Sequence, residues 1–125
     1  MLDYDLVIIG GGPAGLTAGI YGSRARLKTA ILEKGVVGGQ AFTTREIVNF
    51  PGSFENTTGP DLIKDISSHA KAFGTEIIKD EVTDVELNGE VKLIRTKKGN
   101  QYRARAVILA VGAQPRLLNI PGEKN

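Results

Sequence analysis

The hydrophobic residues of this chain fall into short blocks whose spacing predicts alternating strands and helices. Residues 5–9 are a β-branched apolar run, typical of a buried strand, and residues 28–32 form a second such run. Between them, residues 13–25 suit a helix, because a proline at position 13 costs little in the first turn of a helix. The chain therefore begins with a strand–helix–strand unit.

A second helix is predicted at residues 60–73. Thr58 or Gly59 can cap its start, and Asp61 in the first turn suits the helix dipole. Helical spacing places several residues on one face, which we expect to be the packing face. These residues are Leu62, Ile66, His69 and Phe73.

Short strands dominate the rest of the chain. Apolar runs predict strands at residues 75–79, 84–87 and 91–96, and Asn88-Gly89 is a strong hairpin-turn signal between the last two. The final run, residues 106–112, is nearly continuous in apolar residues, as expected of a strand buried on both faces. The order predicts an α/β domain in which a small antiparallel meander precedes the last buried strand.

Composition narrows the possible functions. The 125 residues are 41% hydrophobic, enough for one domain with a real core, and no apolar run approaches the roughly 20 residues of a bilayer span. The 16 basic and 14 acidic residues are mixed without a basic stripe, so neither nucleic acid nor a membrane is an expected partner. There is no cysteine and no secretion signal, and a cytoplasmic location is the default.

The glycines after the first strand suggest a nucleotide site. Gly10, Gly12 and Gly15 form a G-x-G-x-x-G motif between a predicted strand and a predicted helix. In such motifs the first glycine permits a sharp turn, the second lets a pyrophosphate approach the backbone, and the third lets the helix pack closely. Glu33 closes the second strand, where an acid accepts hydrogen bonds from ribose hydroxyls. A dinucleotide site is therefore predicted, and a glycine-rich turn without a ligand is the alternative.

Further motifs identify a family. They are GGGPAG at 10–15, GGQ at 38–40, IVNFPG at 47–52, TGPDL at 58–62, AVGAQPR at 110–116 and IPGE at 120–123. Through them essentially the whole chain resembles the N-terminal FAD segment of the low-molecular-weight thioredoxin reductases. Near relatives of that family include the flavoprotein reductase of the peroxiredoxin system and the ferredoxin-dependent and ferredoxin–NADP reductases of the same build.

The resemblance implies a fold and a binding site. Residues 1–125 would form the first part of a split, Rossmann-like FAD-binding domain of the ββα sandwich type, in which a parallel sheet with helices carries a small antiparallel β-meander. The cofactor-binding residues that it implies are Gly10, Gly12, Pro13, Ala14, Gly15, Glu33, Lys34, Gly35, Val36, Val37, Gly38, Gly39, Gln40, Asn49, Val82, Ala110 and Gly112.

The resemblance also divides these residues by role. Residues 10–15 would hold the pyrophosphate of FAD, Glu33 and Lys34 would lie at the adenosine ribose, and the main chain of Val82 would meet the adenine. Residues 38–40 would run beside the flavin.

Two of the implied residues have simpler alternatives. Asn49 would point its amide at the cofactor, or would be only a turn residue. Gly112 would belong to a second glycine turn over the cofactor, formed by residues 110–112, or would simply end a strand.

Three family motifs are absent from the 125 residues. They are a Cys-x-x-Cys, a second glycine motif for NADPH, and a Gly-Asp motif that completes the flavin site, all of which follow the IPGE point in the family. We therefore expect no catalytic and no metal-binding residue in this chain. NADPH and thioredoxin, or a related electron acceptor, would bind through the missing domain of a homodimeric protein. A related reductase that uses ferredoxin or lacks a dithiol, and a non-catalytic nucleotide-binding subunit, are the alternatives.

Overall fold

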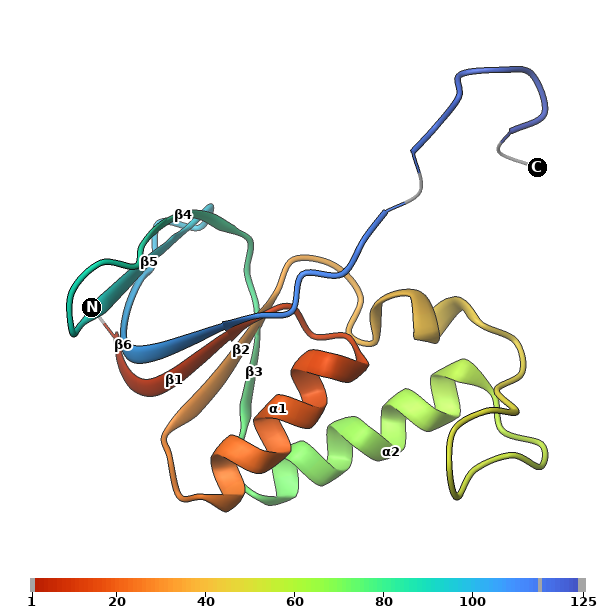
Figure 1. Ribbon diagram of the computed structural model, residues 1–125, viewed down its shortest axis with the longest axis horizontal. Coiled ribbons are helices and arrows are strands. Elements are labelled where there is room, and N and C mark those ends of the chain that lie inside the picture. The colour runs from red at the N-terminus through yellow and green to blue at the C-terminus, as the bar shows by residue number, and fades with distance from the viewer. Residues whose placement is uncertain (1, 115, 124–125) are drawn as a thin grey trace.

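Four parallel strands form the centre of the computed structural model, which describes residues 2–114 and 116–123 (Figure 1). In sheet order they are β3 (Glu76–Lys79), β2 (Thr29–Glu33), β1 (Leu2–Ile9) and β6 (Gln101–Leu109). β1 is the central strand, with Val7 opposite Ala30 on one side and Val107 on the other. Pro115, within the AVGAQPR motif, lies outside the described residues.

The antiparallel meander continues this sheet. β4 (Val82–Glu86) pairs with β5 (Lys92–Thr96), which in turn pairs with the first half of β6. A five-residue loop, 87–91, connects β4 and β5, and its Gly89 has a positive φ of 88°. The hairpin predicted from Asn88-Gly89 is confirmed, with a loop longer than the two-residue turn.

Helices cover one face of the sheet (Figure 1). α1 (Pro13–Arg24) connects β1 to β2, and α2 (Gly59–Ala72) packs beside α1. A 3₁₀ helix, η1 (Gly39–Thr43), precedes α2, and Thr58 caps α2 by accepting the N–H of Asp61 at 3.2 Å. The core between helices and sheet is formed by Leu6, Ile8, Leu16, Ile31, Ile47, Leu62, Ile63 and Ile66. These elements confirm the predicted α/β fold and the predicted strand–helix–strand unit.

The packing face of α2 differs from the predicted one. The buried side chains are Leu62, Ile63, Ile66 and Ala70, whereas His69 is exposed and lies against the Phe73 ring, with the ring centroids 5.3 Å apart. Ala70 is fully buried because its small side chain lets the helix approach its neighbours. The prediction that His69 and Phe73 lie on the packing face was wrong, because both are exposed.

The last strand also differs from expectation. β6 runs from Gln101 to Leu109, so residues 110–112 lie beyond it, and its second half is not buried on both faces. Leu109 is 60% exposed and Val111 is 70% exposed. β5 pairs with β6 only as far as Ala104, so within the described residues the far edge of the remaining strand has no partner.

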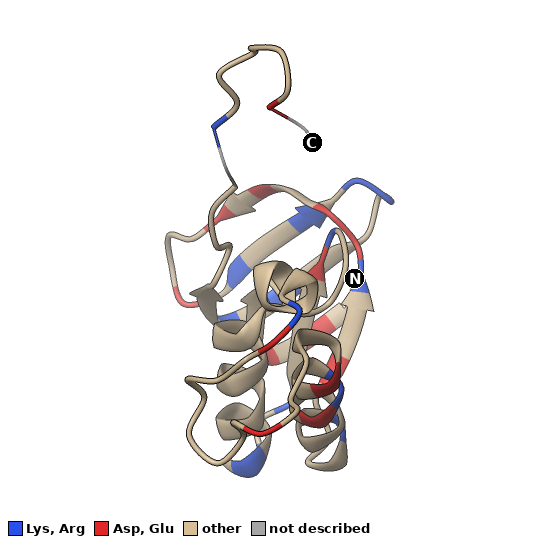
Figure 2. Ribbon diagram, turned by 90° about the vertical axis from the view of Figure 1, so that its right-hand side faces the viewer, with Lys and Arg blue, Asp and Glu red and all other residues tan. Residues whose placement is uncertain are grey.

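Charged residues of both signs are interspersed over the helices and strands in the view of Figure 2. Surface ion pairs such as Arg95–Asp84 at 2.7 Å connect neighbouring strands. Among the described residues, no helix is long and apolar enough to cross a membrane. The same residues contain no cluster of acids and histidine suited to a metal ion.

Candidate cofactor-binding site

The turn after β1 is packed so tightly that two of its glycines have no room for a side chain. Gly10 has a φ of +111°, and a Cβ on it would lie 2.0 Å from the carbonyl oxygen of Ala110. A Cβ on Gly15 would lie 1.8 Å from the carbonyl oxygen of Gly10. The end of β1, the start of α1 and the chain after β6 therefore meet backbone to backbone.

Gly12 is different, because it borders open space. It is the N-cap of α1, with an ordinary φ of −78°, and the nearest atom to a Cβ built on it is the Gly38 carbonyl oxygen at 3.9 Å. Pro13 has no N–H, so Ala14 and Gly15 carry the first amides of α1 without an intrahelical acceptor. Bare amides at the positive end of a helix dipole, beside open space, suit a phosphate group.

Glu33 connects this turn to the loop after β2. Its Oε1 accepts the N–H of Gly11 at 2.9 Å and its Oε2 accepts the N–H of Gly35 at 2.7 Å. A carboxylate oxygen can accept more than one hydrogen bond, so both oxygens keep capacity for ribose hydroxyls. Gly11 lies within the predicted turn 10–15, but its hydrogen bond to Glu33 was not predicted, because the G-x-G-x-x-G pattern leaves its position free.

The loop that carries GGQ closes against the same turn. The N–H of Gly38 donates to the carbonyl oxygen of Gly11 at 2.7 Å, and Gly38 itself has a φ of +110°. A Cβ on Gly38 would lie 2.7 Å from the Ile63 side chain in α2. The side-chain amide of Gln40 donates to the carbonyl oxygen of Ala113 at 2.7 Å, which joins this loop to the chain after β6.

A hollow of about 160 Å³ lies beside the glycine turn. Four predicted site residues, Gly10, Glu33, Lys34 and Val82, line it together with Ile9, Leu32, Asp80, Glu81 and Val111. They come from the carboxyl ends of the parallel strands and from the start of β4. Ligands of doubly wound sheets bind at this edge.

Asp80 is the buried acid of this hollow, at 3% exposure. Burial by itself raises the pKa of its carboxyl, but hydrogen bonds from Thr96, Asn100, Glu81 and Lys98 outweigh that effect and hold the pKa below its usual range. Asp80 is therefore ionised near neutral pH. It was not predicted, although an acid that directly follows a parallel strand was a usable signal.

The remaining predicted residues lie around this centre. Pro13, Ala14 and Gly15 begin α1, residues 35–38 connect β2 to η1, Gly39 and Gln40 begin η1, and Ala110 and Gly112 follow β6. Asn49 is exposed in the irregular segment 44–58, whose ends are joined by the Gly59 N–H to Thr44 carbonyl hydrogen bond at 2.9 Å. It is not among the residues lining the hollow.

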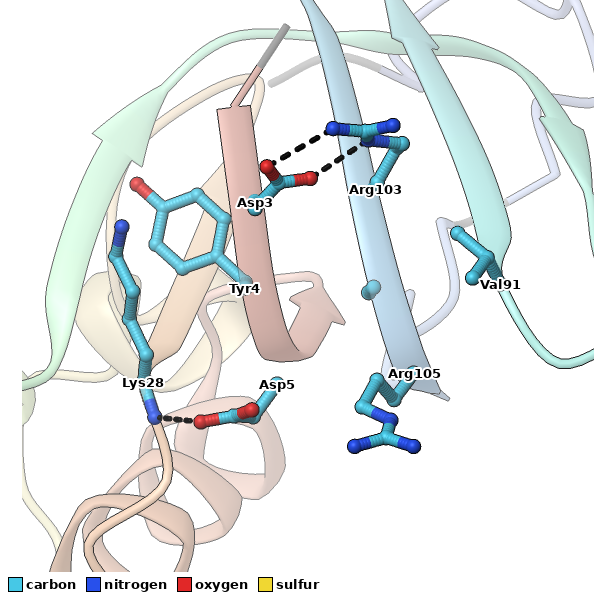
Figure 3. A pocket seen from close by; sticks show the side chains of 8 residues that line it. Asp3, Tyr4, Asp5, Lys28, Val91, Arg103 and Arg105 are labelled. Carbon is cyan, nitrogen blue, oxygen red and sulfur yellow. Dashed lines mark hydrogen bonds and ion pairs between the residues drawn. The ribbon is translucent and has the colours of Figure 1, made fainter.

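A larger hollow, about 450 Å³, lies at the opposite end of the sheet (Figure 3). The carboxylate of Asp3 accepts two hydrogen bonds from Arg103, at 2.6 and 3.0 Å, and the Lys28 ammonium lies 4.8 Å from the centre of the Tyr4 ring. Most of its residues come from the amino-terminal halves of β1 and β6, and the others, Lys28 and Val91, directly precede β2 and β5. No glycine of the turn after β1 lines this larger hollow, whereas Gly10 and Glu33 line the smaller one. The smaller hollow is therefore the candidate site.

Comparisons with known proteins place the chain in a family. A family model described as pyridine nucleotide-disulphide oxidoreductase matches residues 4–125. A thioredoxin reductase from Peptoclostridium acidaminophilum is 50% identical over 121 residues, which are 97% of this chain and 38% of that protein. The chain therefore spans less than half the length of this relative.

Solved structures share the fold. The thioredoxin reductase of Streptococcus pyogenes MGAS5005 matches with a TM-score of 0.89 at 40% identity, over 98% of this chain and 39% of that one. A ferredoxin-flavin thioredoxin reductase from Clostridium acetobutylicum matches with a TM-score of 0.81 at 28% identity, over 94% of this chain and 40% of that one.

Proposed function

The chain belongs to the pyridine nucleotide-disulphide oxidoreductase family, and on this basis we propose that it forms the FAD-binding part of a thioredoxin reductase-like flavoprotein. The observation that carries the proposal is the open backbone at Gly12, which precedes the free amides of α1 and follows Gly11, whose N–H the Glu33 carboxylate accepts. FAD would supply the electron-transfer chemistry, and the protein would supply binding, orientation and electrostatics.

The residues present fit a dinucleotide with a pyrophosphate in its middle. The amides of Gly12, Ala14 and Gly15 would hold the pyrophosphate, because bare N–H groups at a helix start favour anions. The Glu33 carboxylate would accept hydrogen bonds from the ribose hydroxyls, and Lys34 would lie beside it.

The two ends of the cofactor would meet different loops. The main chain of Val82, which lines the hollow, would lie at the adenine. Gly38, Gly39 and Gln40 would run beside the flavin, and residues 110–112 would close over it. The Gln40–Ala113 hydrogen bond supports this arrangement, because it brings the two flavin-side segments together.

The activity of the whole protein extends this proposal. Electrons would pass from NADPH through FAD to a protein disulfide, that of thioredoxin or a related acceptor, in a cytoplasmic homodimer. The 125 residues contain no cysteine. Disulfide exchange would therefore use residues outside them, and this chain by itself would be inactive.

A second candidate is a related reductase that receives its electrons from ferredoxin. The similarity to the ferredoxin-flavin thioredoxin reductase of Clostridium acetobutylicum supports it. The two candidates differ in the electron donor, which an assay can supply separately. In both, the segment 10–40 would have the same task of holding FAD.

The test is a disulfide-reduction assay with thioredoxin, driven by NADPH or by reduced ferredoxin. It is run on the longer protein that we propose contains this chain, hereafter the full-length protein, and on the 125-residue chain with excess FAD. We expect NADPH-dependent turnover from the full-length protein and none from the chain alone. Turnover with ferredoxin only would favour the second candidate, and turnover by the 125 residues alone would overturn the proposed division of labour.

A further inference from the structure

Asp80 is held by the turn between β5 and β6. Its Oδ1 accepts the N–H of Glu81 at 2.9 Å and that of Lys98 at 3.4 Å, and its Oδ2 accepts the side-chain amide of Asn100 at 3.2 Å. A buried carboxylate with this many donors fixes the backbone that supplies them, because leaving any of these groups unpaired is costly.

The same turn holds the residues on both sides of Asp80. The ammonium of Lys98 donates to the carbonyl oxygen of Lys79 at 2.7 Å. The N–H of Lys97 donates to the carbonyl oxygen of Glu81 at 2.8 Å. The corner between β3 and β4 is therefore fastened along its length to residues 97–100.

This corner faces the candidate cofactor site. Asp80, Glu81 and Val82 all line the hollow beside Glu33. The N–H of Asp80 donates to the carbonyl oxygen of Glu33 at 3.0 Å, so the corner is also fixed to the end of β2. Asp80 thus connects the turn at residues 97–100 to the two residues that the proposed function assigns to adenine and ribose.

We propose that Asp80 is a positioning residue for the adenine end of the cofactor site, acting by holding the main chain of Val82 where a base edge can bind to it. The inference rests on the proposed function and goes beyond it, because it assigns base selectivity to a buried carboxylate and to its partner Asn100. Asn100 does not line the hollow. Its side-chain amide donates to Asp80, so we expect its effect on binding to act through Asp80.

The test compares ADP with GDP, which share ribose and pyrophosphate and differ only in the base. Binding of FAD, ADP and GDP to the cofactor-free full-length protein is measured by calorimetry, at a temperature where circular dichroism shows native structure. The variants are Asp80→Ala and Asn100→Ala. The matched control is Asp84→Ala, which removes an exposed acid of β4 paired with Arg95.

We expect Asp80→Ala to weaken the binding of ADP and FAD about tenfold, a change of about 1.4 kcal/mol in binding free energy. The affinity for GDP should stay within about twofold of the wild-type value. Asn100→Ala should lose part of the preference for ADP over GDP in the same way, but by a smaller factor. This variant also tests the inference if Asp80→Ala does not fold. Asp84→Ala should match the wild type.

The contrary results separate a failure of this inference from a failure of the proposed function. Equal weakening of ADP and GDP, unchanged binding in both variants, or a wild type without preference for ADP overturns the inference. A wild type that binds no FAD overturns the proposed function as well.

Discussion

The carboxylate of Glu33 accepts the N–H of Gly11 at 2.9 Å, which joins the end of β2 to the glycine turn after β1. Its other oxygen accepts the N–H of Gly35 at 2.7 Å. One side chain therefore orders both loops of the candidate site. The acid expected to bind ribose also builds the surface on which the cofactor would lie.

Replacing Glu33 with Gln should weaken both functions of this side chain. The substitution removes the charge that strengthens two backbone hydrogen bonds, and leaves only one oxygen to accept them. We expect a loss of about 1 kcal/mol in unfolding free energy and about tenfold weaker FAD binding, measured by denaturant titration and flavin fluorescence. Glu46→Gln, which changes an exposed acid in the segment 44–58, is the control. Wild-type FAD affinity in Glu33→Gln would remove Glu33 from the site.

An added methyl group should impair FAD binding at Gly12 with little loss of stability, whereas at Gly10 it should destabilise the fold. Gly12→Ala places Cβ in open space at an allowed φ, so unfolding free energy should change by less than about 1 kcal/mol while FAD binding falls sharply. Gly10→Ala forces a positive φ and a Cβ 2.0 Å from the Ala110 oxygen, which should cost on the order of 3 kcal/mol. Thermal unfolding and FAD titration of both variants measure this. Full FAD binding by Gly12→Ala would show that the phosphates lie elsewhere.

Local backbone chemistry explains why the glycine turn could be predicted. The motif requires glycine at positions 10 and 15 on steric grounds, and in the structure neither Gly10 nor Gly15 has room for a side chain. The tether from Gly11 to Glu33 and the buried Asp80 could not be predicted in the same way. Both depend on contacts between segments far apart in the chain, which no periodicity records.

The ionisation of Tyr4 offers a test of the fold on the other face of the sheet. Burial and the hydrogen bond from its hydroxyl to Glu76, 2.7 Å long, raise the pKa of Tyr4 far above its ordinary value, and burial also raises the pKa of Tyr102. A raised folded-state pKa gives stability that is fully present below the unfolded pKa of about 10 and is lost as pH rises above it.

This prediction is measured in a Tyr21→Phe background, where Tyr4 and Tyr102 are the remaining tyrosines. Tyrosinate absorbance should be absent at pH values near 10 and should appear together with the loss of native circular dichroism at higher pH. Tyr4→Phe in this background isolates Tyr102. Tyrosinate that forms near pH 10 while the fold stays native would contradict the buried environment.

The second half of β6 shows the limit of apolar patterns. A continuous apolar run predicts a strand buried on both faces, yet Leu109 and Val111 are mostly exposed in the 125-residue chain. The helical spacing of residues in α2 likewise predicted the wrong face for His69, because three- and four-residue spacings fit more than one stripe of a helix. Burial depends on which elements are present to cover a face, and a pattern does not contain that information.

The exposed part of β6 predicts self-association of the isolated chain. An unpaired strand edge and exposed apolar side chains both favour contacts between molecules. Sedimentation velocity on the 125-residue chain should show concentration-dependent association, reduced by Leu109→Lys. Leu87→Lys, at an exposed position in the hairpin loop, should have no such effect. A monomer at every concentration would contradict the prediction.

If the glycine turn and Glu33 hold FAD, the identity and stoichiometry of the bound nucleotide show it most directly. The full-length protein and its Gly12→Val variant are purified, denatured, and analysed for released flavin and nicotinamide nucleotides. We expect stoichiometric FAD from the wild type and almost none from Gly12→Val, whose circular dichroism should stay native. A colourless wild type that carries NAD(H) and takes up no FAD on refolding, or a Gly12→Val variant that keeps its FAD, would contradict this expectation.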